Sequence, residues 1–176
     1  LAPTGIAALN VGGQTIHSFF RFPPSIIHPE NIQTDYVRAE LFKNLEMIII
    51  DEVSMVRSDL MNGIDIALRK NRNKHDLPFG GVQMVFIGDL FQLPPILKDE
   101  ERAPILQTYK GEYFFDASVF KDFSYQFEEL TTIFRQKNDN EFITLLNNVR
   151  NNNLQFDDLV LLNSRHKYNS GIHDNS

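Results

Sequence analysis

Residues 47–52 read Met47-Ile48-Ile49-Ile50-Asp51-Glu52, a short apolar run that ends in two adjacent carboxylates. A continuous apolar run of this length is typical of a strand buried on both faces of a parallel sheet. In such sheets ligands bind outside the carboxyl ends of the strands. One carboxylate placed there can hold Mg²⁺ directly or through water, and its neighbour can accept a proton from an attacking water.

The same six residues also have a purely structural interpretation. Asp51 can cap a helix that follows the strand, with Glu52 in the first turn of that helix. An apolar run followed by Asp-Glu is a short motif that also occurs by chance, so it does not by itself separate the two interpretations.

Patterns of helix and strand alternate on both sides of this run. Apolar spacing and capping residues predict helices over residues 6–11, 34–45 and 58–71, with Ser58 as a helix cap and Val37, Leu41 and Leu45 on one face. A second buried strand is expected over residues 82–87. Further on we expect a charged loop (98–102), strands (113–115 and 125–130) and helices (138–150, with Asp139 as its cap, and 157–162). Such alternation favours an α/β fold with a mostly parallel sheet flanked by helices.

A second polar segment, Gly88-Asp89-Leu90-Phe91-Gln92-Leu93-Pro94-Pro95, follows the second predicted strand. Glycine permits a tight turn, and the Gln92 amide offers a neutral donor and acceptor that could sense a γ-phosphate. In the alternative interpretation this segment is an ordinary turn, in which Asp89 bonds to a nearby backbone amide and Gln92 is solvated.

The composition excludes several classes of protein. A chain of 176 residues with 42% hydrophobic positions can form one globular core, and its formal charge of −6 argues against coating nucleic acid by bulk electrostatics. A localised strand-binding groove remains compatible with that charge. Cysteine is absent, and the five histidines lack zinc-ligand spacing. The sequence contains neither a signal peptide pattern nor an apolar run long enough to span a bilayer, so an intracellular, cytoplasmic protein without a membrane partner is expected, nucleoid-associated in a bacterium.

Six sequence blocks occur in the order typical of the RecD/Pif-type DNA helicases of superfamily one, which the chain closely resembles over nearly its whole length. The blocks are residues 2–8 (Ala-Pro-Thr-Gly-Ile-Ala-Ala), 15–19 (Thr-Ile-His-Ser-Phe), 50–56 (Ile-Asp-Glu-Val-Ser-Met-Val), 78–81 (Pro-Phe-Gly-Gly), 88–95 and 130–136 (Leu-Thr-Thr-Ile-Phe-Arg-Gln). The resemblance implies an ATP-dependent helicase that moves 5′ to 3′ on single-stranded DNA, with ATP, Mg²⁺ and DNA as its ligands and a monomeric state.

The resemblance also implies roles at the ATP site. Asp51 and Glu52 would hold Mg²⁺, and Glu52 would be the general base for water. Gln92 would sense the γ-phosphate. Arg135 would be an arginine finger that stabilises the charge developing on phosphoryl transfer.

DNA contacts are implied for four positions. Thr4 and Gly5 would grip one strand, His17 would contact a phosphate, and Phe19, or its neighbour Phe20, would support the groove or stack on a base. A purely structural role is the stronger alternative for the histidine and the phenylalanines. Most of the fifteen phenylalanines must be core residues, and a lone histidine beside an apolar segment is usually a packed residue.

The glycine-rich phosphate loop G-x-x-x-x-G-K-[ST] does not occur in the sequence. The family places it upstream of residue 1, so we expect an incomplete RecA-like P-loop NTPase fold that lacks its N-terminal P-loop unit. Residues 1–165 would form part of the first motor domain, and residues 166–176 would be a polar tail. These 176 residues alone are expected to bind ATP weakly and not to hydrolyse it.

Two other functions remain open at this point. The chain could belong to another RecA-like ATPase, such as a clamp loader or terminase, although those classes would not be expected to carry residues 88–95 together with Phe134-Arg135-Gln136. It could also be a non-catalytic interaction module that has lost its nucleotide loop. The sequence upstream of Leu1 would decide between that module and a motor.

Overall fold

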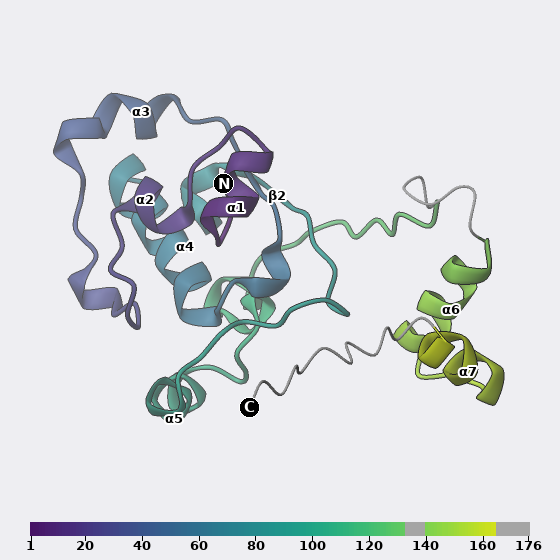
Figure 1. Cartoon of the computed structure of the whole chain (residues 1–176). Coiled ribbons are helices and arrows are strands. Elements are labelled where there is room, and N and C mark those ends of the chain that lie inside the picture. The colour runs from purple at the N-terminus through teal and green to yellow at the C-terminus, as the bar shows by residue number, and fades with distance from the viewer. Residues whose placement is uncertain (133–139, 165–176) are drawn as a thin grey trace, which may run out of the picture. The chain divides into compact units, whose positions relative to one another are not determined.

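The computed structural model describes residues 1–132 and 140–164, which belong to two compact units, Leu1–Gln126 and Phe127–Ser176. The first unit contains α1 (Gly5–Asn10), α2 (Ile16–Phe20), α3 (Ala39–Asn44), β1 (Met47–Ile50), α4 (Ser58–Arg72), β2 (Gln83–Phe86) and α5 (Asp99–Thr108). Short 3-10 turns join them: η1 (Pro29–Asn31), η2 (Tyr36–Arg38), η3 (Val53–Met55), η4 (Pro78–Gly81), η5 (Phe114–Asp116) and η6 (Ser118–Lys121). The second unit contains α6 (Asn140–Arg150) and α7 (Phe156–Ser164) (Figure 1).

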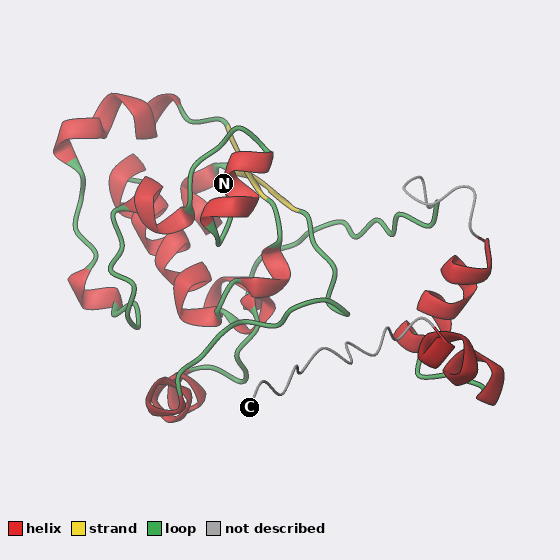
Figure 2. Cartoon of the chain, in the orientation of Figure 1, coloured by secondary structure: helices red, strands yellow, loops and turns green. Residues whose placement is uncertain are grey.

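The two predicted central strands are confirmed as β1 and β2, which pair in parallel from Met47↔Gln83 to Ile50↔Phe86 (Figure 2). The predicted burial of the second strand is wrong, because Gln83 is exposed and Met84, Val85 and Phe86 are only partly buried. On the other side of β1, the Leu1 nitrogen donates to the Ile49 carbonyl at 2.6 Å, and the Leu1 carbonyl accepts from the Asp51 amide at 2.9 Å. β1 is therefore hydrogen-bonded along both of its edges.

The prediction that β1 is buried on both faces is wrong. Ile48 and Ile50 are buried, whereas Met47 and Ile49 on the opposite face are 44% and 46% exposed. Side chains alternate between the two faces of a strand, and the described residues cover only one face of this sheet. A four-residue apolar run does not reveal which of its faces is covered.

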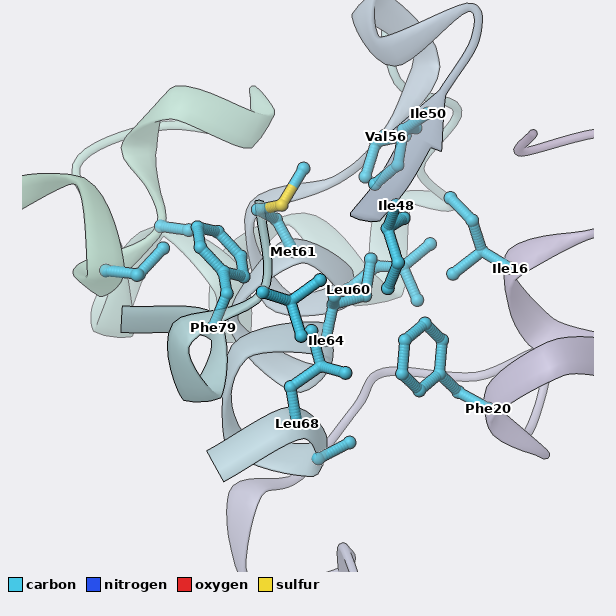
Figure 3. Close-up of a cluster of buried hydrophobic side chains, with 14 of the residues drawn as sticks. Ile16, Phe20, Ile48, Ile50, Val56, Leu60, Met61, Ile64, Leu68 and Phe79 are labelled. Atoms are coloured by element: carbon cyan, nitrogen blue, oxygen red, sulfur yellow. The ribbon is translucent and has the colours of Figure 1, made fainter. Parts of the chain in front are cut away.

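Helix α4 contributes more residues to the buried core than any other element. Leu60, Ile64 and Leu68 recur at helical spacing and meet Ile48 of β1 and Phe20 of α2 in one buried cluster (Figure 3). Burial of each aliphatic side chain of this size contributes roughly 1.5–3 kcal/mol to the stability of the fold. The core of the first unit thus combines α4 with residues of α2, α3, β1 and the 3-10 turns η3, η4 and η6.

The predicted Ser58 cap of this helix is wrong. The N-cap position is Arg57, which makes no side-chain capping bond, and the Ser58 hydroxyl is buried as the first helical residue. At the other end Asn73 adopts a left-handed conformation (φ 53°) and its amide bonds to the Arg69 and Lys70 carbonyls. Such a left-handed residue commonly ends a helix.

The Pro-Phe-Gly-Gly block forms η4 against α4. The Phe79 ring is fully buried, and the Phe79 amide donates to the buried Asp65 carboxylate at 2.6 Å. Gly80 has φ +60°, and a Cβ there would lie 2.7 Å from the Leu68 carbonyl oxygen. Only glycine permits both the conformation and the contact, so this block anchors a loop to the core.

The helix predicted over residues 34–45 is shorter than expected. η2 precedes α3, whose buried residue is Phe42, while Val37 and Leu41 are exposed. The Asp35 side chain accepts from the Arg38 amide at 3.1 Å and caps η2 instead of a longer helix. The packing of α3 therefore depends on Phe42, one position after the expected apolar residue Leu41.

Three predictions in residues 98–130 are wrong. The charged loop at 98–102 is the start of α5, where Glu101 accepts from the Lys98 amide at 3.0 Å. Residues 113–115 form no strand, since only Tyr113 makes an isolated antiparallel bridge, to Arg57, before η5. Residues 125–130 are exposed and carry no regular structure.

The two predicted C-terminal helices correspond to α6 and α7. Asp158 joins them, because its carboxylate accepts from the Asn148 side chain and from the Gln155 amide, both at 2.9 Å. The expected Asp139 cap and the tail at 166–176 lie outside the described residues. Within residues 1–132 and 140–164, no helix is long and apolar enough to cross a membrane.

Candidate functional site

The ends of β1 and β2 bring the two polar sequence segments together. The Ile87 amide donates to the Ile50 carbonyl, and the Val53 amide donates to the Ile87 carbonyl, both at 2.9 Å. These bonds continue the parallel ladder past the last strand residues. Asp51-Glu52 and Gly88-Asp89 therefore leave the same edge of the sheet, where α/β proteins bind their ligands.

The Asp51–Glu52 turn has an unusual backbone. Glu52 has φ 54° and ψ 41°, a left-handed conformation that is uncommon for a residue other than glycine. The Glu52 amide donates to Asp51 Oδ1 at 3.0 Å, and the Asp51 amide is held by the Leu1 carbonyl. Residues in such conformations concentrate at functional sites, where the surrounding structure must hold them in place.

The interpretation of Asp51 as a helix cap is contradicted by this geometry. η3 follows Glu52 without any side-chain capping bond, and the next α-helix starts only at Ser58. Asp51 instead bonds to the amide of its own neighbour. Both carboxylates are partly exposed at the sheet edge, where a ligand can reach them.

Gly88 fixes the distance between the two segments. A Cβ at this position would lie 3.0 Å from the Val53 nitrogen and 3.1 Å from the Ser54 nitrogen. Any larger residue would push the second segment away from the turn that carries Glu52. The glycine therefore serves close backbone contact between the two loops.

The segment after Gly88 is a turn organised by Asp89. Its carboxylate accepts from the Phe91 amide at 3.0 Å and from Gln92 Nε2 at 3.2 Å, and its carbonyl accepts from the Gln92 amide at 3.0 Å. The alternative interpretation of a turn with an Asx-type bond is thus correct for the local backbone. Gln92 lies on the exposed surface of this turn, which follows the strand next to the one that ends in the two carboxylates.

The acidic pair suits Mg²⁺ that arrives with a phosphate ligand. Mg²⁺ is usually bound by one or two carboxylates, with water and substrate phosphates completing its shell. In the described part of the chain, no group of three or more histidine, aspartate or glutamate side chains could enclose a metal ion. The two carboxylates fit a site completed by substrate and do not form a closed protein cage.

The predicted DNA-contacting residues lie on α1 and α2. The Thr4 hydroxyl caps α1 by accepting from the Ala7 amide at 3.2 Å, and Gly5 is exposed at the first position of that helix. The His17 imidazole is partly buried on α2. Burial lowers its pKa, the charge of Arg57 lowers it further, and Asp59 opposes both effects. The neutral form of His17 is therefore favoured in the folded chain.

Phe19 and Phe20 pack against the core. The Phe19 ring makes edge contacts with Phe20 and Phe42, and the Arg38 guanidinium lies 5.8 Å from its centroid. The described contacts of the Phe19 ring are thus with core side chains and with Arg38. Arg135, the predicted arginine finger, lies outside the described residues.

A cluster of buried charges near α4 was missed by the sequence analysis. Arg57, Asp59 and Glu101 meet although the arginine and the glutamate are far apart in sequence. The available signal was Arg-x-Asp at the start of an amphipathic helix, but the second carboxylate of the cluster, Glu101, cannot be found from spacing.

Comparison with known proteins places the chain in a family. A family model described as PIF1-like helicase matches residues 1–159. The ATP-dependent DNA helicase PIF1 of Candida albicans is 37% identical over 161 residues, which are 89% of this chain and 18% of that protein. The human ATP-dependent DNA helicase PIF1 is 33% identical over 153 residues, or 85% of this chain and 22% of that protein.

A solved structure agrees closely with the fold. The crystal structure of Pif1 helicase from Bacteroides in complex with ADP-AlF3 and ssDNA superposes with a TM-score of 0.86 at 45% identity, covering 99% of this chain and 41% of that one. The expected RecA-like α/β fold is thereby confirmed. The chain spans about a fifth of the length of these curated relatives. It belongs to the PIF1-like helicase family.

Proposed function

We propose that this chain forms part of the motor of an ATP-dependent DNA helicase that moves 5′ to 3′ on single-stranded DNA. The observation that carries the proposal is the edge of the sheet where the Asp51–Glu52 turn and the Gly88 segment leave together, with Gly88 against the Val53 backbone and Gln92 in the following turn. Membership of the PIF1-like family supports it, because the relatives in that family are named as ATP-dependent DNA helicases.

In this proposal Asp51 and Glu52 hold Mg²⁺ and Glu52 is the general base. Mg²⁺ bound there would position the phosphates of ATP and offset their charge. Glu52 accepts the proton of the water that attacks the γ-phosphate, and Gln92 senses that phosphate. Arg135 is assigned the stabilisation of transferring charge on the family resemblance alone.

The DNA side of the proposal rests on the first two helices. Thr4 and Gly5 would meet the strand at the start of α1, and His17 would donate a hydrogen bond to a phosphate from α2. Phe19 would hold α2 in place through its ring contact with Phe42 of α3. Single-stranded DNA as the track is supported by a Bacteroides Pif1 structure that is bound to it.

We further propose that residues 1–165 work as part of a longer first motor domain. The phosphate loop that the family places before the Ala-Pro-Thr-Gly block would complete the site. Residues 1–176 alone would then bind ATP weakly and not turn it over. Hydrolysis by the isolated chain that increases with single-stranded DNA would contradict this.

The test of the proposed function is Glu52→Gln in the complete protein that carries this chain. ATP binding should persist while DNA-stimulated turnover falls by at least about 100-fold, the effect expected when a general base is lost. Glu46→Gln is the matched control, because it makes the same change at the residue that directly precedes β1. This variant should keep near-normal turnover. Unchanged turnover in Glu52→Gln would remove Glu52 from this role, and a complete protein without any turnover would favour a non-catalytic module.

A further inference from the structure

The Arg57 side chain, which is 11% exposed, lies at the start of α4 and contacts three separate segments. Its Nε and Nη2 donate to the two carboxylate oxygens of Asp59 at 2.9 and 2.8 Å. Nη2 also donates to the Ser25 carbonyl at 3.1 Å, and Nη1 lies 3.4 Å from Glu101 Oε1. One guanidinium therefore joins α4, the loop after α2 and the helix α5.

Both carboxylates in this cluster hold a backbone amide as well as the arginine. Asp59, whose side chain is 1% exposed, accepts from the Ile27 amide at 2.8 Å. Glu101 accepts from the Lys98 amide at 3.0 Å, at the point where α5 begins. The cluster thus fixes the backbone of two loops besides balancing charge.

Each of these loops continues into a segment of the proposed motor. Lys98 ends the stretch that carries Gln92, and Ser25 and Ile27 end the stretch that starts with α2 and His17. Arg57 itself follows the Asp51–Glu52 turn, separated from it by η3. The charge of Arg57 lowers the pKa of the His17 imidazole, and the charge of Asp59 raises it.

An arginine is suited to this position in a way that lysine is not. Its planar fork has five N–H donors and can bond to two carboxylates and a carbonyl at once, whereas an ammonium is a compact point charge. Burial alone would lower the pKa of Arg57, but its bonds to Asp59 and the charge of Glu101 outweigh burial and raise it. The guanidinium stays charged while it holds all three segments.

We propose that Arg57, through Asp59 and Glu101, is a positioning residue that couples the Gln92 segment to the α2 segment. The inference rests on the proposed function, because it treats these segments as the nucleotide side and the DNA side of one motor. A shift of the Gln92 turn is then passed through α5 and Arg57 to the loop after α2. Coupling between sites of this kind is typically worth a factor of about 5 to 150.

The test uses Arg57→Lys and Glu101→Gln in the complete protein, with ATP turnover measured both without DNA and at saturating single-stranded DNA. The ratio of stimulated to unstimulated turnover should fall at least about five-fold in either variant. The double variant should lose no more than Arg57→Lys alone, because both changes break the same link. Arg102→Gln is the matched control: Arg102 also lies on α5, and loss of its ion pair with Glu112 at 2.9 Å should leave the ratio unchanged.

A ratio that stays at the unsubstituted value in both variants would overturn the inference. So would a fall of both rates together, since a purely scaffolding cluster would lower them without changing their ratio. If Arg57→Lys does not fold, the milder Glu101→Gln, which keeps an acceptor for the Lys98 amide, decides the question. Absence of DNA stimulation in the unsubstituted protein would overturn the proposed function itself.

Discussion

Two loops leave the same edge of the sheet, and the fold holds them to different degrees. The turn after β1 runs into Val53, Ser54 and Val56, which are all buried. The segment after β2 exposes apolar side chains instead: Leu90 is 53%, Phe91 66% and Ile96 75% exposed. The acidic turn is therefore continuous with the core, whereas the Gln92 segment buries Pro95 but leaves its larger apolar side chains exposed.

This difference assigns the two loops different physical roles. A turn embedded in packed residues is preorganised and can hold carboxylates in one geometry, which is what electrostatic stabilisation of a transition state requires. A segment with few buried contacts can move at lower cost. We expect the acidic turn to hold the carboxylates in one geometry and the Gln92 segment to move in response to the γ-phosphate.

The largest effect on stability should come from the core that Val53 and Val56 of the first loop join. Leu68→Ala removes a fully buried side chain from α4 and should lower the free energy of unfolding by about 2–5 kcal/mol. Leu90→Ala in the exposed segment should change it by no more than about 0.5 kcal/mol. Urea denaturation of both variants measures the contrast, and equal losses would show that the second loop is packed as firmly as the first.

An intermediate effect is expected where the two loops touch. Gly88→Ala places a Cβ 3.0 Å from the Val53 nitrogen and should cost about 1–3 kcal/mol, as overpacking usually does. Gly5→Ala is the control, because a Cβ there meets nothing within 4 Å. If Gly88→Ala is as stable as the control by thermal denaturation, the loops are not in fixed contact.

The smallest effect concerns the pH dependence of stability near the start of α4. The folded pKa of His17 is lowered from its ordinary value of 6.5, first by burial and then by the charge of Arg57. As pH falls through 6.5 the unfolded chain binds a proton more readily than the folded chain, so stability present above that pH is lost. His17→Gln should flatten this acid-side loss in melting temperature, and His28→Gln, at an exposed position, should not.

The sequence predicted the elements whose signals are local. The strands β1 and β2, the helices α1, α4, α6 and α7, and the polar segments after the two strands follow from apolar runs and helical spacing. Capping and burial were harder to predict, because they depend on partners far away in sequence. Phe42 is buried where Leu41 was expected to be. Ser58 is buried as the first residue of α4, and the N-cap position is Arg57.

The site could be predicted as residues but not as geometry. The resemblance named Asp51, Glu52 and Gln92, yet the left-handed Glu52 and the contact of Gly88 with Val53 appear only in three dimensions. Helix α5 was missed because Pro104 lies inside it, although Asp99, Glu100 and Glu101 form an acidic first turn that favours a helix start. The buried cluster of Arg57, Asp59 and Glu101 has no periodic signal at all.

The central claim is that the two loops form one site for ATP hydrolysis. It is tested most directly by a double-mutant cycle of Glu52→Gln and Gln92→Ala on the DNA-stimulated kcat of the complete protein. Residues that act as a unit are strongly non-additive, so the double variant should be no more than about three-fold slower than Glu52→Gln alone. If the two losses simply multiply, Glu52 and Gln92 act independently and the claim of a single site is wrong.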